Sequence, residues 1–293
     1  MKKFIAFLML AVVLVSSVGC SDTNTDSSKL QIYTSFYAVY DFTKEIAGDY
    51  ADVYNIVPTG TEPHDWEPTV QDMAKINNAD IVFYNGLGME SWIDKVQSSI
   101  GNSDVNFVEL SKGVDVGESS TDPHIWLDPN NTKIMCKNIL NTLCEADPDN
   151  KAIYEVNYNN YMVSLESIDK LYTDTISSLY NKNIVVSHEA YSYLCKAYGL
   201  TQTAIDGISA DSEPSPEKMM ELINFVKENN IKYIFYEELV SKKTAETLAS
   251  ETGTQLLPLN PFEGLTEEEI SNGENYITVM EKNLENIKLA LMN

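Results

Sequence analysis

The sequence predicts an α/β fold of two lobes, each a parallel sheet flanked by helices, with one long rigid helix bridging them. The 293-residue chain is about twice as long as a typical domain of roughly 150 residues, so two lobes are expected. In both halves, short apolar runs typical of buried strands alternate with amphipathic helical segments, which favours parallel sheets covered by helices. Residues 149–181 contain neither glycine nor proline, and this predicts the bridging helix.

The N-terminal lobe is expected at residues 29–149. Its strands are predicted from short apolar runs at 30–34, 51–57, 80–84 and 107–110. Its helices are predicted at 37–47, 69–78 and 89–98, and a further one contains Cys136 and Cys144. Gly48 directly follows the first of these helices, at the position where glycine commonly ends a helix.

The linking helix is expected at residues 150–181. Apolar and aromatic residues recur at helical spacing from Ile153 to Leu179, which predicts one helix of about 30 residues, roughly 45 Å long. Such a helix is long enough to span two lobes, and a coiled-coil arm is the alternative. The C-terminal lobe then occupies residues 182–293, with strands at 184–187, 203–205, 233–236 and 255–259. Its helices are predicted at 189–198, 216–229, 242–251 and 275–291.

The N-terminus has the features of an export signal. Lys2 and Lys3 precede an apolar run over residues 4–15 that is too short for a membrane span. Small residues then precede Cys20, and a polar stretch follows, so this region resembles a bacterial lipoprotein cleavage site. We expect a signal peptide at 1–19 and a lipidated tether at 20–28, anchored through Cys20 to the outer face of the cell membrane. Cleavage nearby without lipidation is the alternative, and it also exports the chain.

The composition excludes several classes of protein. It is that of an ordinary globular chain, which argues against disorder and against a multispanning membrane protein. Acidic residues number 44 and basic residues 20, all of them lysine, and the formal net charge of −24 repels nucleic acid. We expect a monomer without a nucleic-acid partner. The three cysteines after Cys20 are expected as buried apolar side chains rather than a disulfide framework or a zinc thiolate site.

All three histidines of the chain are predicted to lie where regular structure is interrupted. His64 lies in the turn-rich segment 58–68, His124 lies before a helix, and His188 follows the strand at 184–187 and is expected to open the next helix. A single loop histidine is usually a solvated or capping residue. Three together indicate a metal site instead, because ligands bind at the carboxyl ends of parallel strands and imidazole is a common zinc ligand.

Four motifs in order carry a family resemblance. They are Gly60-Thr61-Glu62-Pro63-His64-Asp65-Trp66-Glu67-Pro68, Asp122-Pro123-His124-Ile125-Trp126-Leu127-Asp128-Pro129, Ser187-His188-Glu189-Ala190-Tyr191 and Glu213-Pro214-Ser215-Pro216. From about Lys29 to its end, the chain resembles the zinc and manganese solute-binding lipoproteins of metal-uptake ABC transporters. The resemblance implies two α/β lobes bridged by a rigid helix, with limited lobe movement and loop rearrangement on delivery rather than wide closure.

The resemblance also implies a ligand set. It assigns His64 and His124 as metal ligands, and His188 stands where zinc-type members carry histidine and manganese-type members a carboxylate. A nitrogen-rich site favours Zn²⁺ over Mn²⁺, which is the weaker candidate. Many members carry an aspartate at the position of Asn260, whereas a subgroup with a Leu-x-Pro-x-Glu pattern points to Glu263 as the fourth ligand. A water molecule is the alternative fourth ligand, and Glu62 is a more distant candidate.

The predicted function is an extracytoplasmic receptor that captures zinc between two lobes and delivers it to a membrane permease driven by a separate ATPase. The chain has no Walker motif and is therefore not the ATPase. A zinc-dependent hydrolase or hydratase with three histidines and an open water position is the alternative, although the chain has no His-Glu-x-x-His motif. We do not expect an enzyme. Glu237 and Glu238, at another strand end, are expected either to partner the imidazole N–H groups or to lie on the surface.

Overall fold

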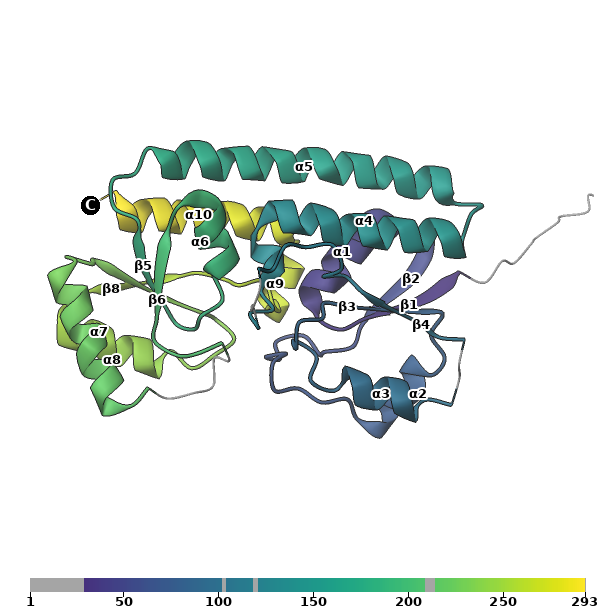
Figure 1. Ribbon diagram of the computed structural model, residues 1–293, viewed down its shortest axis with the longest axis horizontal. Coiled ribbons are helices and arrows are strands. Elements are labelled where there is room, and N and C mark those ends of the chain that lie inside the picture. The colour runs from purple at the N-terminus through teal and green to yellow at the C-terminus, as the bar shows by residue number, and fades with distance from the viewer. Residues whose placement is uncertain (1–28, 102–103, 118–120, 209–213, 293) are drawn as a thin grey trace, which may run out of the picture.

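The computed structural model describes residues 29–101, 104–117, 121–208 and 214–292. Figure 1 shows two α/β lobes side by side, with helix α5 (Lys151–Ser177) running along the same side of both. The predicted fold class is confirmed. The predicted signal peptide at 1–19, the tether at 20–28 with Cys20, and Glu213 lie outside the described residues. No helix in the described part of the chain is both long and apolar enough to cross a membrane.

The first lobe is built on one parallel sheet with helices on both faces. Its strands are β1 (Leu30–Thr34), β2 (Ala51–Asn55), β3 (Ile81–Tyr84) and β4 (Asn106–Glu109), in the order β2-β1-β3-β4. Its helices are α1 (Tyr37–Ala47), α2 (Val70–Ile76), α3 (Ile93–Ser99) and α4 (Pro129–Ala146), with a 3₁₀ turn, η1, at Ile125–Leu127.

Side-chain alternation along β3 explains the two helical layers of this lobe. Phe83 packs into the core formed with α1 and α4, and its neighbour Val82 packs into the core formed with α2 and α3. Helix α3 begins at Ile93, later than predicted, because the Glu90 carboxylate accepts hydrogen bonds from the backbone N–H groups of Asn85 and Gly86 and holds this segment as a turn.

Helix α5 packs against α1 and α4 of the first lobe and against α6 and α10 of the second. Its 27 residues correspond to about 40 Å at a rise of about 1.5 Å per residue. It ends at Ser177, a few residues before the predicted end. The reason is local, since the Ser178 hydroxyl and the Lys182 ammonium donate hydrogen bonds to carbonyl groups of the last turn.

The described residues of the second lobe contain four short strands, which form two parallel pairs rather than one continuous ladder. The strands are β5 (Asn183–Val186), β6 (Thr201–Ala204), β7 (Tyr233–Tyr236) and β8 (Gln255–Pro258), paired β5-β6 and β7-β8. Strands β5 and β7 are neighbours. Just beyond β5, the Ser187 hydroxyl donates a hydrogen bond to the Phe235 carbonyl at 3.2 Å and joins the two pairs.

Among the described residues, five helices follow the linking helix, and α6 and α10 contact the first lobe. They are α6 (Ser192–Tyr198), α7 (Pro216–Glu228), α8 (Lys243–Thr252), α9 (Glu267–Ser271) and α10 (Tyr276–Leu291). The prediction that His188 opens a helix is wrong, because α6 begins only at Ser192. The intervening N–H groups bond elsewhere, that of Glu189 to Gly207 and that of Ala190 to His188, and this leaves His188 in a loop.

Buried hydrogen bonds join the lobes. The Trp126 indole N–H, in the first lobe, donates to the carbonyl of Pro261, in the second, at 2.7 Å. The Tyr276 hydroxyl, at the start of α10, donates to the Trp126 carbonyl at 2.8 Å. The side chains of Phe36, Trp126, Phe262 and Tyr276 belong to one buried core that spans both lobes. The segments on either side of the lobe boundary therefore form one packed unit.

We expect Trp126→Phe to lower the free energy of unfolding by about 2 kcal/mol or more, since it leaves the buried Pro261 carbonyl without its donor and removes ring volume. Urea unfolding of the metal-free protein measures this change. Trp66→Phe is the control, because the half-buried Trp66 packs on Trp92 and takes no part in the hydrogen bond to Pro261. Equal losses in the two variants would contradict the role of the hydrogen bond.

Candidate metal centre

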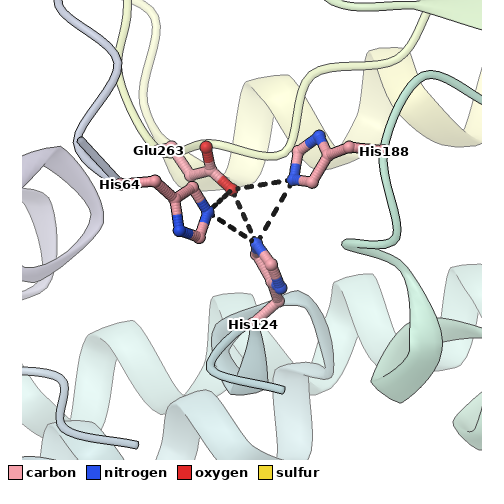
Figure 2. A group of neighbouring side chains, drawn as sticks. All are labelled: His64, His124, His188 and Glu263. Atoms are coloured by element: carbon pink, nitrogen blue, oxygen red, sulfur yellow. Dashed lines mark hydrogen bonds and ion pairs between the residues drawn. The ribbon is translucent and has the colours of Figure 1, made fainter. Parts of the chain in front are cut away.

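The structure brings together the four side chains that the sequence singled out. His64 lies in the loop between β2 and α2, and His124 directly precedes η1. His188 follows β5 and Glu263 follows β8, so each lobe supplies two of the four side chains. Their donor atoms all lie within 4.8 Å of one another. Figure 2 shows the three imidazoles and the carboxylate converging on one point.

Five of the six distances between these donor atoms are close to the edge of a tetrahedron around a small metal ion. His124 Nε2 lies 3.1 Å from His64 Nε2 and 3.3 Å from His188 Nε2. Glu263 Oε1 lies 3.0 Å from the Nε2 of His124, 3.4 Å from that of His188 and 3.5 Å from that of His64. Zinc–ligand distances of about 2.0–2.1 Å give a regular tetrahedron with an edge of about 3.3–3.4 Å. Three nitrogens and one oxygen at this spacing suit Zn²⁺.

The burial of the Glu263 carboxylate calls for a compensating positive charge at this site. His124 and His188 are fully buried, and Glu263 is only 2% exposed. When the imidazoles are neutral and carry their proton on Nδ1, neither Glu263 oxygen has a hydrogen-bond donor among the described residues. A buried carboxylate without a partner costs several kcal/mol, and three imidazole lone pairs aimed at it add repulsion. A divalent cation at the centre removes both penalties.

In the absence of a metal, protons take the place of the cation. Burial alone would lower the pKa of His188, but the carboxylates of Glu237 and Glu263 outweigh it and raise this pKa well above its usual value. Burial opposes the charge on Glu263 as well, yet His188 and contacts with the other two imidazoles hold the pKa of its carboxyl well below the usual value. In the metal-free site these shifts favour an ionised Glu263 beside a protonated imidazole.

A strained turn positions the Glu263 side chain. Phe262 has a φ of 59°, in the left-handed region that side chains other than glycine, asparagine and aspartate rarely adopt. Its backbone N–H donates to Asn260 Oδ1 at 2.7 Å, and its ring is buried against Tyr37 and Tyr276. These contacts hold the turn that directs Glu263 toward the histidines.

Asn260, where many family members carry an aspartate, and Glu62, the more distant candidate for the fourth ligand, both lie outside the four-donor group. The Asn260 amide donates to Glu269 Oε1 and its oxygen accepts from Phe262, so Asn260 shapes the turn. The Glu62 carboxylate accepts the backbone N–H of His64 at 3.1 Å and lies outside the four-donor group. Burial and the nearby Glu263 charge raise the pKa of Glu62 to about 8. The cysteines at 136, 144 and 195 are free thiols apart from this site.

Two carboxylates contact the imidazoles from outside the donor group. Glu237 Oε1 lies 2.8 Å from His188 Nδ1, which realises one of the two expectations for this residue. Glu238 is exposed and contacts no imidazole. Asp122 Oδ1 lies 2.7 Å from His124 Nδ1, and sequence reasoning missed this residue. The signal was present in Asp122-Pro123-His124, because an aspartate two residues before a histidine can reach both its backbone N–H and its ring.

Comparisons with known proteins show that the chain is similar to zinc-uptake and zinc-binding proteins. Residues 32–290 match the family model described as zinc-uptake complex component A, periplasmic. The high-affinity zinc uptake system protein ZnuA of Bacillus subtilis (strain 168) is 38% identical over 314 aligned positions, covering 99% of this chain and 98% of that protein. The zinc-binding lipoprotein AdcA of Streptococcus pneumoniae (strain R6) is 39% identical, covering 98% of this chain but only 61% of that protein.

A solved structure agrees with these sequence matches. The Zn(II)-bound ZnuA-like domain of Streptococcus pneumoniae AdcA superimposes with a TM-score of 0.82 at 41% identity. The match covers 90% of this chain and the whole of that domain. This chain thus spans the ZnuA-like part of AdcA and about three fifths of the full-length protein.

We expect zinc affinity to fall by at least about tenfold for each pH unit below about pH 6.5, the ordinary histidine pKa, because zinc must displace the proton that the raised pKa of His188 keeps in place. Affinity falls as the pH is lowered because the imidazoles of the metal-bound state carry no proton on the ligating nitrogen. Competition against a chromophoric chelator at several pH values measures the dependence. A flat profile would contradict a three-histidine site.

Proposed function

The chain belongs to the zinc-uptake complex component A family, and we propose that it captures zinc between its two lobes outside the cytoplasm and delivers it to an ABC permease for import. The family match confirms the resemblance inferred from the sequence motifs. The observation that carries the proposal is the group of three imidazoles and one carboxylate, two residues from each lobe, at tetrahedral spacing.

The ligand assignment is part of this proposal. His64, His124 and His188 bind zinc through Nε2, and Glu263 binds it through Oε1. Three nitrogen donors favour Zn²⁺ over Mn²⁺, which prefers oxygen and stands lowest in the divalent affinity series. The spacing of the four donor atoms supports Glu263, rather than water, as the fourth ligand.

A filled tetrahedron also supports a receptor rather than an enzyme. A catalytic zinc keeps one position open for water or substrate, whereas structural and transport sites close the shell with protein ligands. With Glu263 bound, this site has no such position. The relatives described above are named for zinc uptake and zinc binding, and the hydrolase alternative gains no support from them.

Delivery of the ion depends on the two lobes and the helix between them. We propose a first lobe at 29–149, a linking helix at 150–181 and a second lobe at 182–293. The buried core that includes Trp126 and Phe262 crosses the lobe boundary, so wide opening would expose large aromatic side chains to water. Release through rearrangement of the ligand loops, with limited lobe movement, is the less costly route.

The partners follow from the same proposal. A membrane permease accepts the ion, and a separate ATPase drives import. We propose that the chain is exported as a monomer and anchored through a lipid on Cys20 to the outer face of the cell membrane, with residues 20–28 as the tether. Two acyl chains hold far better than one, which suits a receptor that must remain near its permease.

We expect Glu263→Ala to lower zinc affinity by more than about 100-fold, because loss of a direct ligand costs more than the 10- to 100-fold typical of an outer partner. Competitive titration of the purified protein from Cys20 onward, with zinc and with manganese, measures this change. Glu238→Ala is the matched control, since it removes an exposed carboxylate of the same lobe that contacts no imidazole.

The titration separates the alternatives. One-to-one zinc binding that the Glu263 variant weakens, and that manganese competes for poorly, supports a closed zinc receptor. Unchanged zinc affinity in the variant would indicate water as the fourth ligand and reopen the catalytic alternative. A preference for manganese would overturn the argument from His188.

We expect Cys20→Ser to abolish the incorporation of labelled palmitate into the protein, since the thioether to diacylglycerol forms on the cysteine sulfur. The measurement is metabolic labelling followed by precipitation of the protein from the membrane fraction. Ser21→Ala, one residue away, is the control and retains the label. Label that persists in the Cys20 variant would contradict this anchor.

A further inference from the structure

Asp122 and Glu237 each approach an imidazole on the side facing away from the proposed zinc position. Asp122 Oδ1 lies 2.7 Å from His124 Nδ1, and Glu237 Oε1 lies 2.8 Å from His188 Nδ1. The Asp122 side chain is 13% exposed and that of Glu237 only 4%. Both contacts are therefore largely shielded from competition with water.

These contacts determine which nitrogen of each ring is free to bind a metal. A neutral imidazole carries one proton, either on Nδ1 or on Nε2, and only the other nitrogen has a lone pair to offer. A carboxylate that faces Nδ1 accepts a hydrogen bond only when the proton is there. The lone pair is then left on Nε2, the atom that faces the centre of the cluster in both residues.

The two carboxylates are themselves fixed in place by different parts of the fold. Asp122 Oδ1 also accepts the backbone N–H of His124 at 3.0 Å, and the Asp122 carbonyl accepts a hydrogen bond from the Tyr193 hydroxyl of α6. Glu237 directly follows β7, whereas His188 follows β5. Its contact with His188 therefore lies beside the hydrogen bond from Ser187 to Phe235, where the two strand pairs of the second lobe meet.

His64 differs from the other two histidines. Among the described residues, its Nδ1 has no hydrogen-bonding partner, and the nearby Glu62 contacts its backbone N–H instead of its ring. Its side chain is 8% exposed, whereas those of His124 and His188 are fully buried. Orientation by a carboxylate is thus a property of two particular ligands rather than of every histidine at the site.

We propose that Asp122 and Glu237 are positioning residues that hold His124 and His188 in the Nδ1–H form, with Nε2 directed at the zinc ion. This inference rests on the proposed zinc-binding function. Together with Glu263, the two oriented rings direct three of the four donor atoms at the zinc position, so that little rearrangement of side chains opposes binding.

The test compares alanine and amide variants at both positions. We expect Asp122→Ala and Glu237→Ala each to lower zinc affinity by about 10- to 100-fold. Asp122→Asn and Glu237→Gln keep an oxygen that accepts the Nδ1–H bond, so we expect them to bind zinc at least about threefold more tightly than the alanine variants. The measurement is competitive titration with zinc alone at one pH and ionic strength.

Matched controls separate orientation from loss of negative charge. Glu238→Ala removes the carboxylate adjacent to Glu237, and Asp115→Ala removes an exposed carboxylate that accepts the backbone N–H of Gly117. Both controls are expected to bind zinc within about twofold of the parent, because their charges do not face a ring. Thermal unfolding of the metal-free variants verifies that each one is folded.

Cobalt(II) provides a readout that a general loss of stability does not change. Four-coordinate tetrahedral Co²⁺ absorbs visible light strongly, and Co²⁺ that gains water ligands absorbs weakly. We expect the cobalt-loaded parent and control variants to show the intense tetrahedral bands, and the folded alanine variants to show weakened bands at saturating metal.

The possible outcomes distinguish this inference from the function on which it rests. Absence of one-to-one zinc binding in the parent would overturn the proposed function. Normal zinc binding in the parent, with alanine variants that match it within threefold and retain the cobalt bands, would overturn the positioning role alone. Equal losses in the Glu237 and Glu238 variants, or amide variants no better than alanine, would assign the effect to charge instead.

Discussion

The carboxylate of Glu263, buried against three imidazoles, is the constraint on which the rest of the site depends. Without a cation, the protein must keep a negative charge away from water and compensate it with protons on the histidines. Such a group is unfavourable unless the fold holds it in place. The buried packing around Phe262 and the hydrogen bond from Trp126 to Pro261 supply that restraint in the two residues directly before Glu263.

The architecture explains how four residues far apart in sequence meet at one point. His64 and His188 lie in the loops after β2 and β5, Glu263 lies in the loop after β8, and His124 directly precedes η1. Loops at the carboxyl ends of parallel strands gather along one edge of a sheet. Placing two such edges face to face joins the loops of one lobe to those of the other. Helix α5 packs on α4 and α10 along one side of the two lobes. The contact between the lobes at the site is therefore made by loops.

Periodicity and breaker residues predicted most of the fold, because they report burial and local backbone geometry. Helices α1 and α10 and strands β1 and β7 begin and end within one residue of their predicted bounds. Segments 89–92 and 189–191 were wrongly expected to be helical, since side-chain and long-range backbone hydrogen bonds override their helical pattern. The short helix α9 was missed because it depends on a capping box at Thr266 and Glu269 rather than on an apolar face.

The candidate site was predicted in part for similar reasons. The metal site was predicted from three histidines at breaks in regular structure, whereas Glu263 was inferred from a family pattern. Asp122 was missed and Glu237 left undecided, because a contact between a carboxylate and an imidazole across two segments has no periodic signature in the sequence. The left-handed backbone at Phe262 could not be predicted either, since phenylalanine rarely adopts this conformation.

Because each lobe supplies two of the four donor atoms, the supply of zinc should affect the stability of the receptor itself. With this ligand set, the bound ion acts as a cross-link between halves of the chain, and an ion that binds only the folded state adds about 4 kcal/mol of stability at a concentration 1,000 times its dissociation constant. Zinc-replete and zinc-starved cells would then display the same polypeptide in two states of different resistance to heat and to proteases. Turnover of the receptor at the cell surface would thereby follow the availability of the metal.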